Sequence, residues 1–199
     1  FSMKPKSWTQ DTEMKRLFDI WLALILGVLL TPLAFGVWLA IKLEDRGPAL
    51  YWSKRVGKKN QLFWMPKFRS MKLDTPQVAT HLLTHAQSQI TRVGAFIRKT
   101  SLDEIPQLWS VLRGDMSMVG PRPALFNQED LITLRTQKNI HQLKPGITGW
   151  AQINGRDELS IPDKVLLDEF YLRHQCFSLD LKILWLTVFK VLTKEGVAH

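Results

Sequence analysis

The sequence lacks most of the motifs that mark common functional classes. Its single cysteine, Cys176, cannot form an internal disulfide, so nothing in the fold requires an oxidising compartment. The chain has no Walker-type glycine loop, no Gly-x-Gly-x-x-Gly motif, no zinc-type Cys/His spacing and no Asp-x-Asp pair. These absences remove support for P-loop ATPases, dinucleotide oxidoreductases, zinc fingers and many nucleotide-sugar glycosyltransferases. His81 and His85 are four residues apart, but no acidic third ligand accompanies them in a recognised spacing, so they give weak support for a metal site.

The size and charge of the chain predict one basic domain. With 199 residues, of which 45% are hydrophobic, the chain is long enough for a single domain with a real core. Lys and Arg outnumber Asp and Glu by 27 to 18, which gives a net charge of +9. This excess predicts a polyanionic partner: nucleic acid, an acidic membrane surface or a phosphorylated substrate. The eight tryptophans are typical of a protein at a membrane interface, although Trp is also common in cores.

The longest uncharged run, Ile20–Ile41, could cross a bilayer core of about 30 Å as a helix. Thr31-Pro32 lies in its middle, and proline removes a backbone hydrogen bond, so the helix should bend there. Basic residues flank both ends, and the positive-inside tendency would keep both flanks in the cytosol. A re-entrant helix is therefore one interpretation, and an ordinary transmembrane helix with a tolerated proline is the other.

The remaining sequence predicts an α+β fold that is mostly helical with a small β-hairpin. Leu50–Val56 and Gln61–Arg69 are β-prone and are separated by a turn-forming segment. Phe177–Leu192 is apolar with a basic margin, which is typical of an amphipathic interfacial helix and equally of a core helix. Residues 1–46 would then hold the membrane segment and residues 47–199 a catalytic domain on the cytosolic face. Further helices are expected at 75–99, 106–112 and 126–142.

Two adjacent carboxylates, Asp103 and Glu104, follow the basic pair Arg98-Lys99. Ser101 and Glu104 have the spacing of a capping box, so these residues could simply open a helix. The chemical interpretation is that a carboxylate attacks phosphorus and forms an acyl phosphate, which splits a difficult transfer into two easier steps. Mg²⁺ and arginines would keep the paired acids ionised and neutralise charge on the phosphoryl group.

Five stretches, in order across nearly the whole chain, resemble the bacterial sugar transferase family, the monotopic phosphoglycosyl transferases or undecaprenyl-phosphate sugar phosphotransferases. Any one stretch could arise by chance, but five in order make a specific match. They are Lys15–Asp19 (KRLFD), Lys67–Met71 (KFRSM), Ser101–Gln107 (SLDEIPQ), Gly114–Pro123 (GDMS and VGPRP) and Pro145–Arg156 (PGITGWAQINGR).

The resemblance implies that Asp103 is a nucleophile that takes the sugar phosphate from a UDP-sugar and releases UMP. It implies that Glu104 acts beside it, with Mg²⁺ bound at this acidic pair. Polyprenyl (undecaprenyl) phosphate would accept the sugar phosphate at the cytoplasmic face of the bacterial inner membrane, the first membrane step of glycoconjugate assembly. A re-entrant helix broken at Ser-Pro is also implied, and Thr31-Pro32 holds that place here. The implied substrate- or phosphate-binding residues are Lys67, Arg98, Arg122, Gln152, Arg156 and Asp168.

Some of these roles also make physical sense from the residues alone. Arg122 presents a planar fork suited to phosphate oxygens, and the prolines on either side would hold its backbone rigid. We expect Lys67 and Arg69 to point to opposite faces of the presumed strand, with at most one of them, Lys67, facing the substrate. For Asp168 the other interpretation is an ordinary exposed acid.

A second class of function stays open at this point. A non-enzymatic, membrane-anchored module could use its basic face to bind acidic lipid or nucleic acid, because basic and aromatic residues alternate in stretches such as Tyr51–Arg55. The transferase interpretation expects no nucleic acid. It also gives the anchor a purpose, because an active site at the interface would meet a lipid phosphate without extracting the lipid.

Overall fold

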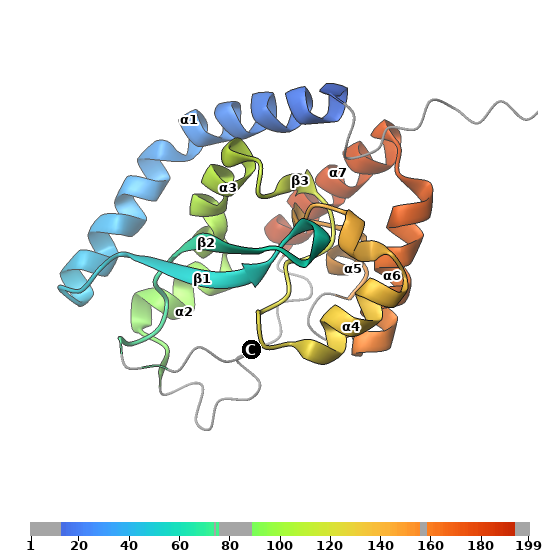
Figure 1. Cartoon of the computed structure of the whole chain (residues 1–199). Helices are drawn as coiled ribbons and strands as arrows, with labels where there is room; N and C mark the ends of the chain where they lie inside the picture. The colour runs from blue at the N-terminus through green and yellow to red at the C-terminus, as the bar shows by residue number, and fades with distance from the viewer. Residues whose placement is uncertain (1–12, 74, 76–88, 156–158, 194–199) are drawn as a thin grey trace, which may run out of the picture.

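The computed structural model describes residues 13–73, 75, 89–155 and 159–193, which form a mostly helical α+β fold, as predicted (Figure 1). His81 and His85 lie outside the described residues. The elements, with η for 3₁₀ helices, are α1 (Glu13–Glu44), β1 (Leu50–Val56), η1 (Lys58–Asn60), β2 (Leu62–Phe68), α2 (Arg92–Lys99), η4 (Leu102–Gln107), α3 (Leu108–Arg113), β3 (Ser117–Val119), α4 (Glu129–Gln137), η5 (Ile140–Gln142), β4 (Gly146–Thr148), α5 (Trp150–Ile153), α6 (Ile161–His174) and α7 (Phe177–Thr193).

The predicted hairpin is confirmed. Strands β1 and β2 pair antiparallel from Leu50 opposite Phe68 to Val56 opposite Leu62. The turn passes through Lys59 and Asn60, both with positive φ, a conformation that Asn tolerates better than most residues. This turn fixes the register, and the register decides which side chains share each face of the hairpin.

A second, parallel sheet of β3 and β4 was not predicted from the sequence. Ser117 lies opposite Gly146, and Val119 lies opposite Thr148. A Cβ on Gly146 would lie 2.1 Å from the backbone nitrogen of Gly120, so only glycine permits this close approach. The pairing brings the end of β3 against the segment that follows residue 145, and this fixes the start of the loop that carries Arg122.

Helix α1 buries two charged side chains near its start and exposes many apolar side chains along its length. Only five of its 32 residues are buried, and Lys15 and Asp19 are two of them. Along the same helix Val28 is 75% exposed, and Trp21, Leu29 and Phe35 are also exposed. So much exposed apolar surface is unusual in water and suits a helix whose outer face contacts lipid. By length and composition α1 is able to cross a membrane.

The expected break at Thr31-Pro32 is a bend within a continuous helix. Pro32 lies inside α1, and the hydroxyl of Thr31 donates a hydrogen bond of 2.6 Å to the carbonyl of Gly27. Hydroxyl bonds to the preceding turn and a missing proline N–H both bend helices without ending them. Figure 1 shows the result, because α1 follows a curved path along one side of the molecule.

The first turns of α1 are held to the protein body by buried polar contacts. Lys15 forms an ion pair with Asp180 of α7, and the hydroxyl of Tyr171 donates to the same carboxylate at 2.8 Å. Asp19 accepts a hydrogen bond from the backbone N–H of Met118 in β3 at 3.1 Å. The Lys15–Asp19 stretch therefore fixes the direction in which the apolar part of α1 leaves the body.

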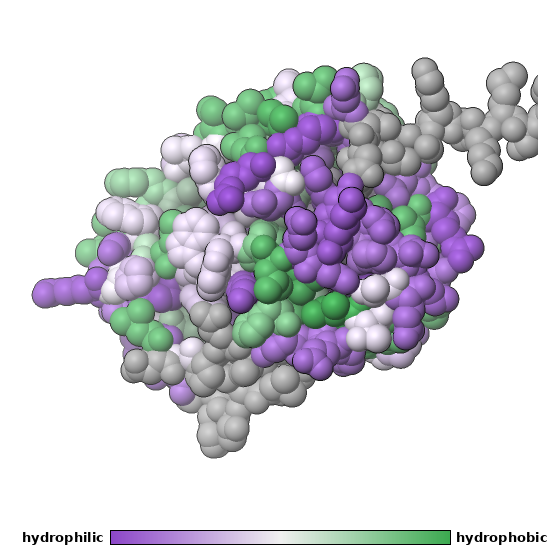
Figure 2. All heavy atoms as spheres, in the orientation of Figure 1, coloured by the Kyte–Doolittle hydropathy of each residue, from purple (hydrophilic) through white to green (hydrophobic). Residues whose placement is uncertain are grey.

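Helix α7 satisfies both interpretations of its pattern. On one side Ile183 is fully buried in the main core, and on the other Trp185 is 72% exposed and Phe189 is exposed. The rings of Phe18 and Phe177 meet edge to face at 5.5 Å, which joins this face to that of α1. Hydrophobic residues gather along the α1 edge of the molecule in Figure 2. Together α1 and α7 offer an apolar surface suited to a membrane interface.

Candidate active site

The paired acids lie in η4 and directly follow a residue in an unusual backbone conformation. Ser101 has φ 57, in the left-handed region, and its side chain makes no capping hydrogen bond. The Ser101 side chain therefore does not make the hydrogen bond that a capping box requires, and that part of the capping-box interpretation is wrong. A non-glycine residue at positive φ costs about 1 kcal/mol or more, and such residues concentrate at functional sites. The turn directs the carboxylate of Asp103 inward, where the residue is only 9% exposed.

Cations from two other segments meet the acidic pair. Oε1 of Glu104 accepts hydrogen bonds from Lys67 Nζ at 3.0 Å and from Arg122 NH2 at 2.9 Å. Lys67 Nζ also lies 3.9 Å from Oδ2 of Asp103. Strand β2, helix η4 and the loop after β3 thus converge, and they bring together four of the residues proposed from the sequence: Lys67, Asp103, Glu104 and Arg122.

Burial dominates the electrostatics of Asp103. Desolvation raises its pKa, the charge of Lys67 opposes this rise, and the neighbouring charge of Glu104 adds to it. The charges of Arg122 and Arg98 also lower the pKa of Asp103 by smaller amounts. Burial in turn lowers the pKa of Lys67, and Glu104 opposes that change. The site therefore holds its charges in a low-dielectric setting, where an incoming cation or phosphate would interact strongly.

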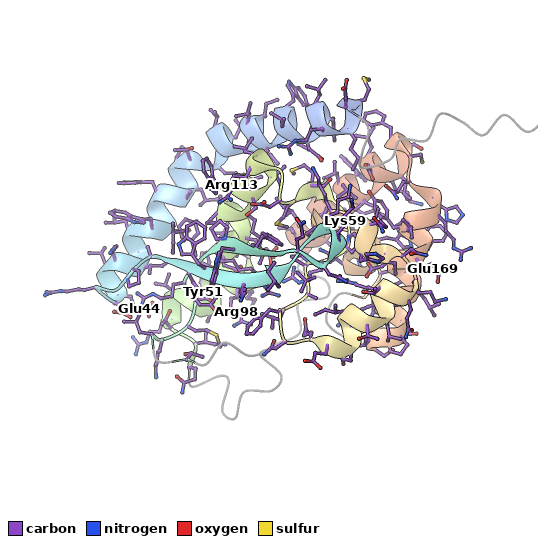
Figure 3. All side chains as sticks on the ribbon, in the orientation of Figure 1. Glu44, Tyr51, Lys59, Arg98, Arg113 and Glu169 are labelled. Carbon is purple, nitrogen blue, oxygen red and sulfur yellow. The ribbon has the colours of Figure 1, made fainter. Side chains whose placement is uncertain are left out.

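Lys67 faces the acids and Arg69 does not, as expected, but strand alternation is not the reason, because residues two apart share one face of a regular strand. Strand β2 ends at Phe68, so the backbone can turn the Arg69 side chain elsewhere. Arg69, just beyond β2, pairs with Asp45 at 2.7 Å. Tyr51 is the cross-strand partner of Lys67, so the two side chains share a face. Figure 3 shows Arg98, from the last turn of α2, close to the hairpin near Tyr51 in this view. The hairpin face that carries Tyr51 and Lys67 is therefore the one that meets the paired acids.

Asp168 is neither an exposed acid nor a contact of the paired acids. It is 1% exposed on α6, and its Oδ2 accepts hydrogen bonds from Arg135 NH2 at 2.6 Å and Nε at 3.0 Å. Arg135 NH1 then donates to the carbonyl oxygen of Arg122 at 2.8 Å. Asp168 thus reaches the site through Arg135, a residue that the sequence reasoning missed.

Of the two remaining proposed residues, only Gln152 lies in the part of the chain that the structure describes, and it is not brought to the acids. Gln152 of α5 donates from Nε2 to the carbonyl of Ile147 at 3.1 Å, which holds its own turn together. Arg156 lies outside the described residues.

A second missed residue is Arg55, at the end of β1. Its Nε donates to Ser53 Oγ at 2.9 Å and its NH1 to the carbonyl of Pro123 at 3.1 Å. The pKa of Arg55 is lowered to about 10, mainly by burial and also by the charge of Arg122, against the opposing charge of Glu104. Strand alternation could have pointed to Arg55, because residues 51, 53 and 55 share one face of the strand. Lys67 pairs with residue 51 and therefore lies on the same face of the hairpin.

The donor set at the site suits one kind of metal binding. In the described ranges there is no group of three or more His, Cys, Asp or Glu side chains able to hold a metal. Mg²⁺ is commonly bound by one or two carboxylates together with substrate phosphates and water. Asp103 and Glu104 fit that arrangement and do not fit a cage built by the protein alone.

Comparison with known proteins identifies the family. The family model described as bacterial sugar transferase matches residues 10–194. An uncharacterized sugar transferase, EpsL, of Bacillus subtilis is 42% identical over 186 residues, which cover 92% of this chain and 90% of that protein.

Two relatives carry functional names. The UDP-glucose:undecaprenyl-phosphate glucose-1-phosphate transferase of Escherichia coli is 41% identical over 89% of this chain and 40% of that protein. The undecaprenyl-phosphate galactose phosphotransferase of Salmonella typhimurium is 36% identical over 92% of this chain and 41% of that protein. The chain thus spans about two-fifths of the length of these two relatives.

Proposed function

Because the chain belongs to the bacterial sugar transferase family, we propose that it transfers a sugar phosphate from a UDP-sugar to undecaprenyl phosphate, a polyprenyl phosphate. The observation that carries this proposal is the convergence at η4, where a buried Asp103 lies beside Glu104 and the cations Lys67 and Arg122. The family and this geometry favour an enzyme over a non-enzymatic basic module. Nucleic acid has no part in the reaction.

In the first step the carboxylate oxygen of Asp103 attacks the phosphorus that bears the sugar. The new O–P bond forms as the bond from that phosphorus to the bridging oxygen breaks, and the electron pair leaves with UMP. The product is an aspartyl-phosphosugar, a mixed anhydride. Lys67 and Arg122 lie where they would neutralise charge on the phosphate oxygens during the transfer, and the planar fork of Arg122 suits two such oxygens.

In the second step a phosphate oxygen of undecaprenyl phosphate attacks the same phosphorus. The bond to Asp103 breaks, its electron pair returns to the carboxylate, and the product is undecaprenyl-diphosphate sugar. The chain therefore ends the cycle unchanged. Two substitutions at one phosphorus replace a single direct transfer between two anionic substrates, which is the advantage of a covalent intermediate.

Asp103 and Glu104 would hold the Mg²⁺ required for the reaction. When bound, the ion supplies charge neutralisation for the carboxylates and the donor phosphates. Burial raises the pKa of Asp103, so added positive charge at the acids favours the ionised, nucleophilic form of this carboxyl.

Removal of the metal is expected to abolish turnover. We expect the full-length protein in detergent or nanodiscs to release UMP from a UDP-sugar and undecaprenyl phosphate with Mg²⁺, and to lose at least about 10²-fold of this rate in excess EDTA. Added Mg²⁺ should restore the rate, whereas Na⁺ at equal ionic strength should not. Full activity in EDTA would overturn the metal assignment. No UMP release across a panel of UDP-sugars would overturn the proposed function.

The apolar faces of α1 and α7 support a site of action at a membrane. The acceptor keeps its phosphate at headgroup depth, so the active site must lie close to the interface. We propose the cytoplasmic face of the inner membrane, because UDP-sugars are cytosolic. We also propose that α1 enters and leaves by that face, because of its bend at Pro32 and its basic flanks, with Lys42 and Arg46 at the C-terminal end.

Cysteine labelling tests this topology. In a Cys176→Ser background, Glu13→Cys and Arg46→Cys place thiols at exposed positions at the two ends of α1. We expect a membrane-impermeant maleimide to label both in inverted membrane vesicles and neither in intact spheroplasts. Labelling of the two positions from opposite sides would show a true crossing and contradict the re-entrant topology.

A further inference from the structure

The segment that carries Arg122 is fixed at every carbonyl. The oxygens of Pro121, Arg122, Pro123 and Ala124 accept hydrogen bonds from four different places in the chain, at 2.9, 2.8, 3.1 and 3.0 Å respectively. The first and last donors are the backbone N–H groups of residues 146 and 56. The middle two donors are guanidinium groups. The carbonyls of Arg122 and of the residue after it are thus held by arginine side chains.

These two arginines come from elements that lie far apart in the sequence. Arg55 comes from β1 of the hairpin, and Arg135 comes from α4. Each is itself oriented by a second contact, Arg55 by the hydroxyl of Ser53 and Arg135 by the buried carboxylate of Asp168. A planar guanidinium with donors in a fixed fork can make both of its contacts at once, whereas a lysine ammonium cannot reproduce that geometry.

We propose that Arg55 and Arg135 are positioning residues that clamp the backbone of Arg122, so that its guanidinium is held on Glu104 before substrate binds. We call this pair the arginine clamp. The inference rests on the proposed function, since it assigns a purpose to the exact placement of Arg122. It also explains why Asp168 is buried on α6, because this carboxylate orients one arm of the clamp.

The local structure shows what loss of the clamp would permit. A cavity of about 30 Å³ lies against the segment and is lined by Pro121, Pro123, Ala124 and Arg135 among others. A backbone that loses its hydrogen bonds beside an open space can shift into it. Misplacement of a catalytic group by about 1 Å can cost roughly 10²-fold in rate, so a modest shift of Arg122 would be visible in turnover.

The test uses lysine substitutions, because deletion of either arginine could harm folding. Arg135→Lys keeps a cation for the buried Asp168, and Arg55→Lys keeps a charge near Glu104. We expect each to lower kcat for UMP release about 10-fold or more while changing KM for the UDP-sugar less than about 3-fold. In an Arg122→Met background the same substitutions should change the remaining rate by less than about 2-fold, because the clamp acts through Arg122.

Two nearby lysines serve as matched controls. Lys54 precedes Arg55 but lies over the ring of Phe126, and Lys138 follows Arg135 by one turn but pairs with Glu169. Their Met variants should keep wild-type kcat within about 2-fold. Wild-type rates for both clamp variants, or losses that persist in full in the Arg122→Met background, would overturn the clamp alone. A wild-type protein that releases no UMP would overturn the proposed function and the clamp with it.

Discussion

Replacement of Asp103 by Asn is expected to lower the rate of UMP release by at least roughly 10⁴-fold while leaving the protein folded. The amide has nearly the shape of the carboxyl but no nucleophilic oxygen of comparable strength, so the covalent step is lost. Stability should be retained, because burial raises the pKa of Asp103 and the folded protein therefore gains little from its charge. The thermal midpoint should match the wild-type value or exceed it.

Intact-protein mass spectrometry separates this explanation from a general loss of activity. Wild-type protein incubated with UDP-sugar alone should gain the mass of one sugar phosphate, and Asp103→Asn should gain nothing. Asp115→Asn is the matched control, because that carboxylate also pairs with an arginine, Arg113 at 3.4 Å, yet lies outside the site. An adduct on Asp103→Asn, or turnover within about 10-fold of wild type, would refute the nucleophile assignment.

The parts of the site that were predictable from the sequence are those set by local patterns. The turn at residues 57–60 fixed the hairpin, and the register then placed Lys67 opposite Tyr51. The separation of Lys67 from Arg69 was expected for the wrong reason, because residues two apart share a strand face, and Arg69 turns away where β2 has ended at Phe68. The adjacent acids were evident as a pair, but the sequence did not show which of the two carboxylates would contact the nearby cations. The structure shows that Glu104 takes both strong contacts, while Asp103 is left mainly to burial.

The parts that were not predictable depend on contacts between distant segments. The parallel pairing of β3 with β4 involves only three residues in each strand, too few for a periodic pattern. Asp168 and Arg135 are 33 residues apart, and neither helix has a pattern that marks its buried charge. In a sequence, the two residues of a buried ion pair look like ordinary surface residues. The family resemblance could therefore propose Asp168 for the site, but the sequence could not identify Arg135 as its partner.

The beginning of α1 connects this active site with the membrane. Asp19 binds the backbone of β3, and β3 leads directly into the segment that carries Arg122. The direction of the apolar helix and the position of Arg122 are thus set by the same short strand. The proposed reaction would need that connection, because its acceptor would arrive from the lipid side and its donor from the cytosol.

Replacement of Lys15 by Met is expected to destabilise the folded protein by about 3–5 kcal/mol, because it leaves the carboxylate of Asp180 buried without its cation. Both side chains are essentially inaccessible, and the neutral hydroxyl of Tyr171 that donates to Asp180 cannot replace the charge of Lys15. For a domain of this size the loss should lower the thermal midpoint in detergent by at least about 6 °C.

The double variant Lys15→Met with Asp180→Leu tests the cause of that loss. It removes both charges, and Tyr171 keeps its second contact, the hydrogen bond of 3.2 Å to the carbonyl of Val119. We expect the double variant to recover most of the midpoint, because a buried ion pair can often be replaced by apolar groups at little cost. Lys42→Met, at the other end of α1, should leave the midpoint unchanged. A Lys15→Met protein as stable as wild type, or a double variant less stable than the single one, would show that this ion pair does not hold α1 to the body.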